Sequence, residues 1–300
     1  MNITFRQLRL FLALADTGSV SAAARALHVT QPTASMQLRE VTESVGLPLY
    51  EVVARKVYLT DAGRQLASTA QAIVDEWERF GQTVNAMQGL TRGRLRVALV
   101  STAKYFVPRL LGSFCERHPG IDISLEVLNR DGVVQRLRDN RDDLYVMSMP
   151  PQDMDLEDQT FLANPLVLIA PAGHPLAQRR SLALPALQGE RFILRERGSG
   201  TRQATERFFA DKGFAPETWL ELGSNEAIKE AVAGHLGVAV ISRHALKAED
   251  LARDVCLLPV TGLPIRSQWH VVHPRAKQLS PIARVFREHL LEQARHWPIA

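Results

Sequence analysis

The stretch LRLFLALADTGSVSAAARALHVTQPTAS, residues 8–35, decides how the N-terminal part of this chain folds. Between Thr4 and about Ala15 the apolar side chains recur every three or four residues, which predicts a helix with one buried face. Gly18 then interrupts the pattern. The first element is therefore a short amphipathic helix that needs neighbours to cover its apolar side.

Two further short helices follow in the same stretch. Ser21 is in place to cap a helix over residues 22–27, where a run of alanines favours helix and allows close packing. His28 and Val29 form a tight turn, and Thr30 can cap a third helix with Pro32 in its first turn, where a missing N–H costs nothing. The pattern predicts a helix-turn-helix.

The third helix has the composition of a DNA reader. Its exposed side carries Gln31, Thr33, Ser35 and Gln37, small polar residues whose amides and hydroxyls can reach base edges and phosphates in the major groove. The competing interpretation is a three-helix protein-interaction domain with a polar surface. The helix pattern alone does not decide between DNA binding and protein interaction.

The segment after the third helix favours DNA. Residues 49–58 predict two short strands around Val53 and Ala54, with Arg55 and Lys56 at the return. A hairpin with a basic tip beside a groove-reading helix is a wing, which can hold phosphates or enter the minor groove. The alternative is an ordinary basic turn.

The segment from Phe5 to Leu66 resembles the DNA-binding domain of LysR-type transcriptional regulators. The resemblance rests on the stretch quoted above, on GLPLYE (residues 46–51) and on VYLTDAG (residues 57–63). It implies an N-terminal winged helix-turn-helix that binds double-stranded promoter DNA through the second and third helices and the wing. The implied contact residues are Ser21, Thr30, Gln31, Pro32, Thr33, Ser35, Met36, Gln37, Arg55 and Lys56.

Two positions depart from the family pattern. Val52 stands where many members have an arginine, so Arg55 is the expected wing contact. Met36 stands where relatives carry arginine or another polar residue, and its side chain can contact a thymine methyl group.

From Thr60 onward a heptad seam predicts one long helix. Its apolar residues are spaced four and three apart in alternation: Leu66, Ala70, Ile73, Trp77, Phe80, Val84 and Met87. Such a narrow stripe predicts a homodimer, which would present two recognition helices to DNA. The alternative is a core helix packed on the C-terminal domain.

After Gly93 strands alternate with helices, which predicts parallel α/β architecture. The first strands are at residues 94–100, 121–128 and 142–150, with helices at 103–118 and 133–140. A second set begins near Asn164, and a strand at 269–273 and a helix at 281–294 return to the first set. We expect a winged domain (1–60), a linker helix (61–91) and an effector-binding domain (92–300) with one lobe of about 92–162 and 266–300 and another of about 163–265. In LysR-type regulators this domain resembles a periplasmic binding protein.

Polar residues gather where these strands end and helices begin. Ser101 and Thr102 open a helix with Lys104 nearby, and GSGTR (198–202) and SNEA (224–227) have the same placement in the second lobe. Each could be a simple helix cap, but several such ends facing one cleft would accept an anion. The candidate effector contacts are Ser101, Thr102, Lys104, Asn129, Arg130, Met149, Thr201, Arg202 and Asn225.

A finer resemblance covers residues 101–151. STAKYFVPRLLGSFCERHPGIDISLEVLNR and NRDDLYVMSMPP are similar to the LysR-type regulators of Calvin-cycle (RubisCO, carbon-dioxide-fixation) operons. That resemblance implies a phosphorylated metabolite or a nucleotide cofactor as the effector, rather than a resident cofactor, and implies tetramers that bend promoter DNA and engage RNA polymerase. Another metabolic operon is the alternative.

Composition excludes several other classes. Two distant cysteines, Cys115 and Cys256, form no metal or disulfide pattern, and the charged N-terminus lacks the features of a signal peptide, so we expect a cytoplasmic protein. No apolar run reaches membrane-spanning length, which predicts no membrane partner. A pI of 9.3 favours a polyanionic partner only weakly. An α/β enzyme or a solute-binding protein remains the rival class, but catalytic motifs such as G-x-S-x-G or a P-loop are missing.

Overall fold

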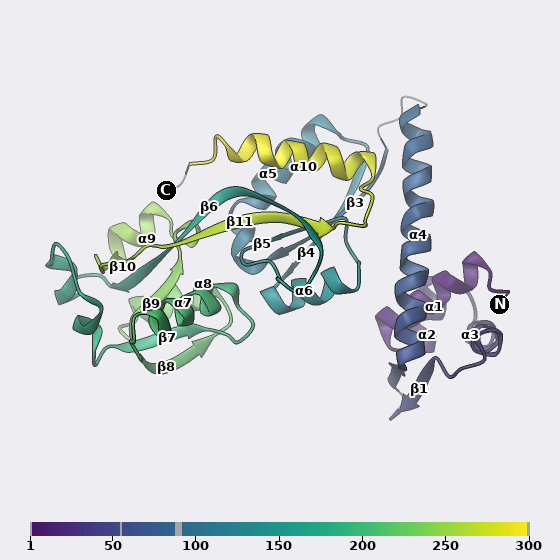
Figure 1. The fold of residues 1–300 in the computed structure, drawn as a ribbon, viewed down its shortest axis with the longest axis horizontal. Coiled ribbons are helices and arrows are strands. Elements are labelled where there is room, and N and C mark those ends of the chain that lie inside the picture. Colours follow the sequence, from purple (N-terminus) through teal and green to yellow (C-terminus); the bar gives the residue numbers. More distant parts are fainter. Residues whose placement is uncertain (1, 55, 88–91, 299–300) are drawn as a thin grey trace. The chain divides into compact units, whose positions relative to one another are not determined.

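The computed structural model describes residues 2–54, 56–87 and 92–298. The chain forms two compact units, Met1–Gly89 with Asp139–Arg141, and Leu90–Arg138 with Asp142–Ala300. Figure 1 labels the helices and strands of both units. Within the described ranges, no helix combines the length and the apolar character that crossing a membrane requires.

The first unit is a winged helix-turn-helix followed by a long helix. Its elements are α1 (Phe5–Thr17), α2 (Val20–Ala26), α3 (Gln31–Val45), the antiparallel hairpin β1 (Tyr50–Val53) and β2 (Lys56–Leu59), and α4 (Asp61–Met87). The core is formed by nearly inaccessible apolar side chains from three helices and the segment before the hairpin, among them Phe11, Leu14, Ala24, Leu38 and Leu49.

Caps fix where the helices of this unit begin and end. Thr4 and Gln7 form a reciprocal capping box at α1, and Gly18 ends that helix with a left-handed φ of 61°. The expected cap of α2 was wrong: Ser19, not Ser21, accepts the hydrogen bond from the backbone N–H of Ala22. The reason is spacing, because a cap must precede its donor by two or three residues, which places Ser21 inside the helix.

A seven-stranded sheet runs through the second unit. Its order is β10-β6-β11-β5-β3-β4, and β9 also pairs with β6. The strands are β3 (Gly93–Val100), β4 (Ile121–Leu128), β5 (Leu144–Met147), β6 (Leu156–Pro171), β9 (Ala239–Ser242), β10 (Val255–Leu257) and β11 (Ile265–Pro274). β3 is parallel to β4 and β5, whereas β11 is antiparallel to β5 and β6. The long strands β6 and β11 run side by side from one lobe into the other (Figure 1).

Helices complete the two lobes. Lobe 1 adds the 3-10 helix η1 (Ser101–Tyr105), α5 (Val107–Arg117), α6 (Arg130–Arg138) and α10 (Pro281–Ala294), all around one apolar core. Lobe 2 adds the parallel pair β7 (Arg191–Arg195) and β8 (Glu217–Leu222), α7 (Gly200–Asp211), α8 (Asn225–Ala233), α9 (Ala248–Arg253), and the short η2 (Pro175–Gln178), η3 (Leu184–Leu187) and η4 (Arg243–Ala245). The two-lobed α/β prediction is confirmed.

Two proline positions explain where the elements differ from expectation. The helix expected from Ala103 is η1 followed by α5, because Pro108 has no N–H and fits only the first turn of a new helix. The strand expected from Pro165 begins nine residues earlier, at Leu156. Pro165 is tolerated because it pairs only with β11 there, and pairing with β9 starts at Leu166.

Candidate DNA-binding and effector-binding sites

Helix α3 buries one side and presents the other. Ala34, Leu38 and Val41 are buried in the core of the unit, at helical spacing. The Thr30 side chain accepts a hydrogen bond from the Thr33 N–H, which fixes the start of the helix. The N-terminal turn of α3 and the face opposite the core are therefore free to enter a groove.

Eight of the ten candidate DNA contacts lie in α2, in α3 or at the N-cap of α3. Thr30, Gln31, Pro32, Ser35 and Met36 are exposed, with Met36 at 56%, and Ser21, Thr33 and Gln37 are half-buried beside them. The Ser21 hydroxyl donates to the Gln31 side-chain oxygen at 3.0 Å. This bond orients the Gln31 amide and leaves its nitrogen as a donor for a base edge.

The wing is attached to the helix-turn-helix by a main-chain hydrogen bond. The N–H of Val57 in β2 donates to the carbonyl of Gly18 at 3.0 Å. Lys56 is exposed near the tip, and the expected contact Arg55 lies outside the described residues. Val52 in β1, which we expected to depart from the family pattern, has its side chain in solvent.

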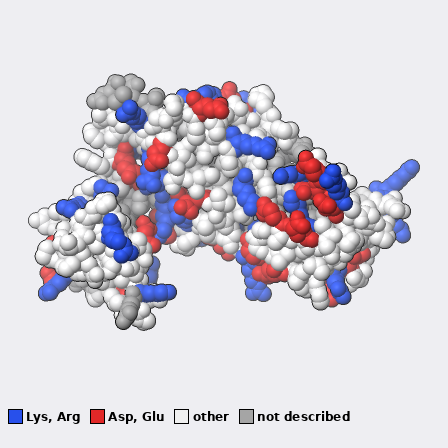
Figure 2. Space-filling view, turned by 180° about the vertical axis from the view of Figure 1, so that it is seen from behind, with Lys and Arg blue, Asp and Glu red and all other residues white. Residues whose placement is uncertain are grey.

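Charge in the DNA-binding unit is balanced rather than basic. Residues 1–89 contain eight Lys or Arg and eight Asp or Glu, so the excess of the whole chain lies in residues 90–300. Figure 2 shows basic and acidic side chains interspersed over the face that it presents. The basic pI is thus not the footprint of a DNA-binding surface, and phosphate contacts must come from individual cations and helix N-termini.

An exposed aromatic group lies along α4. Trp77 is 63% and Phe80 60% exposed, and Ile73 is exposed on the same side. Phe5 of α1 extends the group, with its ring 5.9 Å from that of Trp77. Leu66, in contrast, packs against the core of its own unit, and the Met87 side chain lies outside the described residues.

The second unit contains a small polar cavity between its lobes. It is lined by Val100, Ser101, Thr102, Asn129, Arg130, Ser148, Arg195, Ser199, Gly200 and Thr201. Its volume is about 10 Å³, room for roughly one water molecule. A larger ligand therefore requires the lobes or their side chains to move.

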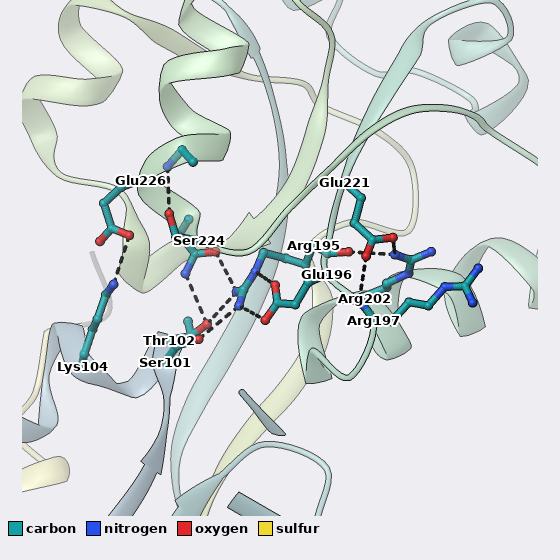
Figure 3. A network of polar contacts seen from close by, with 12 residues as sticks. Ser101, Thr102, Lys104, Arg195, Glu196, Arg197, Arg202, Glu221, Ser224 and Glu226 are labelled. Carbon is teal, nitrogen blue, oxygen red and sulfur yellow. Dashed lines mark hydrogen bonds and ion pairs between the residues drawn. The ribbon is translucent and has the colours of Figure 1, made fainter. Parts of the chain in front are cut away.

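Arg195 dominates this cavity. It ends β7 with only 2% of its surface exposed, and Figure 3 shows its guanidinium group between the two lobes. In lobe 1 it donates to Ser101 at 3.1 Å and Thr102 at 3.3 Å. In lobe 2 it donates to Asn225 at 3.1 Å and twice to Glu196, at 2.8 and 2.9 Å. All five donors of the guanidinium are thus used, and an anion can reach Arg195 only by replacing one of these acceptors.

Two further features of the cavity attract anions. Arg130 donates its Nε to the Met149 carbonyl at 2.8 Å, and its terminal nitrogen is 3.6 Å from the Asp131 carboxylate. Helix α7 begins at this cavity, and its N-cap, Ser199, makes no side-chain capping bond. The first N–H groups of α7 therefore receive no capping bond from the Ser199 side chain, and such helix N-termini can bind phosphate.

A second contact between the lobes is centred on Glu226. Its carboxylate accepts hydrogen bonds from Lys104 at 3.0 Å and from Tyr105 at 2.7 Å. Burial and this bond raise the pKa of Tyr105. Burial also raises the pKa of Glu226, but the bonds from Tyr105 and Lys104 outweigh it and leave that pKa below its usual value. Because its pKa is lowered, the Glu226 carboxylate stays ionised at neutral pH, which stabilises its contact with Lys104 and Tyr105. This stabilisation is lost as the pH falls through that pKa.

The candidate effector residues fall into two groups. Ser101, Thr102, Asn129, Arg130 and Thr201 line the cavity. The other four do not: Asn225 supports Arg195 and Thr102 from behind, Lys104 bonds Glu226, Met149 contributes its carbonyl to Arg130, and Arg202 pairs with Glu206 and Glu221.

Sequence reasoning missed Arg195, Ser148 and Ser199. The signal for Arg195 was present, because FILRERGSG places an arginine at the end of an apolar strand, three residues before a Gly-Ser-Gly turn. An arginine that directly follows buried strand residues is expected to be buried itself, and a buried charge needs specific partners. One partner, Glu196, is the next residue, but Ser101, Thr102 and Asn225 come from distant segments.

A winged helix-turn-helix joined to a two-lobed domain with a small polar cavity defines a DNA-binding regulator that responds to a small molecule. Residues 5–64 match the family model for bacterial regulatory helix-turn-helix proteins of the LysR family, and residues 88–295 match the LysR substrate-binding domain. The chain belongs to the LysR family of transcriptional regulators, so the sequence-based identification is confirmed.

Named relatives cover almost the whole chain. It is 42% identical over 289 residues to the HTH-type transcriptional activator CmpR of Synechocystis sp., covering 96% of this chain and 95% of the relative. It is 43% identical over 294 residues to a RuBisCO operon transcriptional regulator of Allochromatium vinosum, covering 98% and 97%. The regulatory domain of Synechocystis CcmR in complex with 2-PG superposes with a TM-score of 0.67 at 45% identity, covering 69% of this chain and all of that domain. These relatives are regulators and not enzymes.

Proposed function

We propose that this regulator controls a promoter of carbon-dioxide-fixation genes and senses a small anionic metabolite in the cavity around Arg195. Support for the operon comes from relatives named as RuBisCO operon regulators. Support for the effector comes from the CcmR domain, which binds 2-PG. The anionic character rests on one observation: Arg195 and the open N-terminus of α7 meet in the same cavity.

The mechanism we propose is competition at Arg195. Without effector, Glu196 neutralises the guanidinium, and Ser101 and Thr102 connect it to lobe 1. An anion that replaces Glu196 changes the bonds that hold the lobes together, and the altered lobes change how dimers pair into a tetramer and bend DNA. The effector must bind one arrangement better than the other for this coupling to operate.

The promoter contacts we propose are the exposed residues of α2 and α3 together with Lys56 and Arg55 of the wing. Gln31 and Ser35 read base edges, Met36 contacts a thymine methyl group, and the wing binds phosphates. RNA polymerase is the further partner that recruitment to a promoter requires.

Recovery of bound genomic fragments tests this function. Purified protein is mixed with sheared DNA from its host at moderate salt, with and without 2-PG, and bound fragments are sequenced. We expect enrichment of a promoter beside carbon-fixation genes, and loss of that selectivity in Gln31→Ala because the base-reading amide is gone. Enrichment of a different promoter would reject the proposed operon, and equal enrichment by the variant would move the reading surface away from α3.

Dimerisation through α4 gives a separate prediction. Trp77→Ala with Phe80→Ala should raise the dimer dissociation constant at least about 100-fold, because exposed aromatic anchors contribute about 2 kcal/mol or more each when buried in an interface. Sedimentation velocity across a concentration series measures it. Leu236→Ala with Val285→Ala removes two other exposed apolar side chains and should leave the constant unchanged. A dimer that survives the α4 changes would place the interface elsewhere.

A further inference from the structure

The second unit has a larger cavity, distinct from the one around Arg195. Its volume is about 680 Å³, within the range of about 300–1,000 Å³ that small-molecule sites occupy. Helix α7, the long strands β6 and β11, and the segment after β5 form its walls. The lining residues of the Arg195 cavity do not include any of its residues.

Several of the residues that line this cavity are apolar. They include Met149, Pro150, Pro165, Phe208 and Ile265, and Phe208 is only half-buried. A partly exposed aromatic side chain in a concave surface favours a flat apolar group as its neighbour.

Two arginines at the cavity lack partners. Within the part of the chain that the structure describes, neither Arg207 nor Arg266 makes an ion pair or a side-chain hydrogen bond, and both are exposed. The carboxylate of Asp158 already pairs with His270 at 2.7 Å, which leaves Asp211 as the remaining acidic group of the lining. Free guanidinium groups therefore outnumber free carboxylates, and a guanidinium group binds carboxylate or phosphate bidentately.

We propose that this cavity is a second effector site, which binds a small organic anion with an apolar, preferably flat, body. The anionic group lies between Arg207 and Arg266, and the apolar body packs on Phe208 and Ile265. The assignment does not depend on the function proposed for the Arg195 cavity.

The position of the site connects it to the lobes. α7 lines the Arg195 cavity with Gly200 and Thr201 and lines this cavity one turn later, from Ala204 onward. Met149 also connects the two regions, because it lines this cavity and its carbonyl accepts the hydrogen bond from Arg130. A ligand here thus contacts two elements on which the geometry of the Arg195 cavity depends.

Fluorescence titration of the full-length protein with 1-anilinonaphthalene-8-sulfonate tests the site, because this dye is an organic anion with a flat apolar body. Arg207→Gln with Arg266→Gln should weaken its binding at least about tenfold, since a lost hydrogen bond to a charged group costs about 1.5–3 kcal/mol. Gln268→Trp, which fills the cavity from an exposed position of its lining, should have a similar effect.

Two controls make the result specific. Arg179→Gln with Arg180→Gln removes two exposed arginines outside the cavity and should leave dye affinity unchanged. Arg195→Ala should abolish 2-PG binding but leave dye binding intact, which separates failure of this site from failure of the proposed function. Dye affinity that is the same in the wild type, in the Arg207 and Arg266 double variant and in Gln268→Trp would overturn the proposal.

Discussion

Arg195→Ala is expected to lower the affinity of the full-length protein for 2-PG at least about 100-fold. The Arg195 guanidinium is a buried positive charge in the cavity and makes five hydrogen bonds, distributed over both lobes. An anion that replaces one of its acceptors would bond to this charge, and each hydrogen bond to a charged group is worth about 1.5–3 kcal/mol. Isothermal titration calorimetry measures the change. Arg197→Ala removes a nearby arginine whose side chain points away from the cavity (Figure 3) and should change affinity by less than about threefold.

Glu196→Gln shows whether the Glu196 carboxylate competes with the effector for Arg195 or only holds Arg195 in position. If the Glu196 carboxylate occupies the place that an anionic effector takes, removing its charge should raise 2-PG affinity, by about tenfold for a difference near 1.4 kcal/mol. If Glu196 merely positions Arg195, the same change should lower affinity. The sign of the effect therefore decides the mechanism.

Gly63→Ala should destabilise the DNA-binding unit. Gly63 lies in the first turn of α4, and a Cβ atom there would be 1.9 Å from the carbonyl oxygen of Leu49. That oxygen already accepts the N–H of Thr60, and the Thr60 hydroxyl both caps α4 and donates to the Pro48 carbonyl at 2.7 Å. An added methyl group must displace this backbone junction, at a cost of about 3 kcal/mol.

Gly81→Ala is the matched control in the same helix. A Cβ atom at Gly81 meets nothing within 4 Å, so alanine should stabilise α4 by about 0.5–1 kcal/mol through its higher helix propensity. Hydrogen exchange of the α1 and α3 amides in the full-length protein reports the local stability. In Gly63→Ala we expect faster exchange of these amides and weaker DNA binding. Unchanged exchange would show that the backbone between Leu49 and Gly63 can accommodate the added methyl group.

The balanced charge of the DNA-binding unit bears on how DNA binding responds to salt. With eight basic and eight acidic residues in the first 89, binding depends on a few placed contacts rather than on a broad basic surface. We therefore expect the amide and hydroxyl groups at the start of α3 to carry much of the interaction, which is why substitution of Gln31 is expected to affect selectivity.

The N-terminal unit was predictable in detail because its interactions are local. Thr30 caps its own helix, Gly18 ends α1 in the left-handed conformation, and the apolar spacing of α3 sets which residues it buries. Each of these depends on residues three or four apart, so the pattern is legible in the chain itself. The one misplaced cap, Ser21 for Ser19, is an error of two residues within the correct element.

The effector cavity was predictable only in part. Strand ends pointed to Ser101, Thr102 and Thr201, since polar residues that follow apolar strands gather at one edge of a parallel sheet. They also pointed to Lys104 and Arg202, whose carboxylate partners Glu226, Glu206 and Glu221 lie outside the cavity. Sequence shows that a charged group is near a strand end, but not which acid it meets.

The sequence by itself determined the class of protein, the order of its elements and the candidate surface for DNA contacts, because helix periodicity, caps and turns are local properties of the chain. Only the tertiary structure decided which groups line the cavity that we propose as the ligand site. Arg195 receives its five acceptors from residues up to 94 positions away, and the second cavity combines α7 with strands from two separate segments. Such contacts depend on how long strands cross between lobes, which no local pattern encodes.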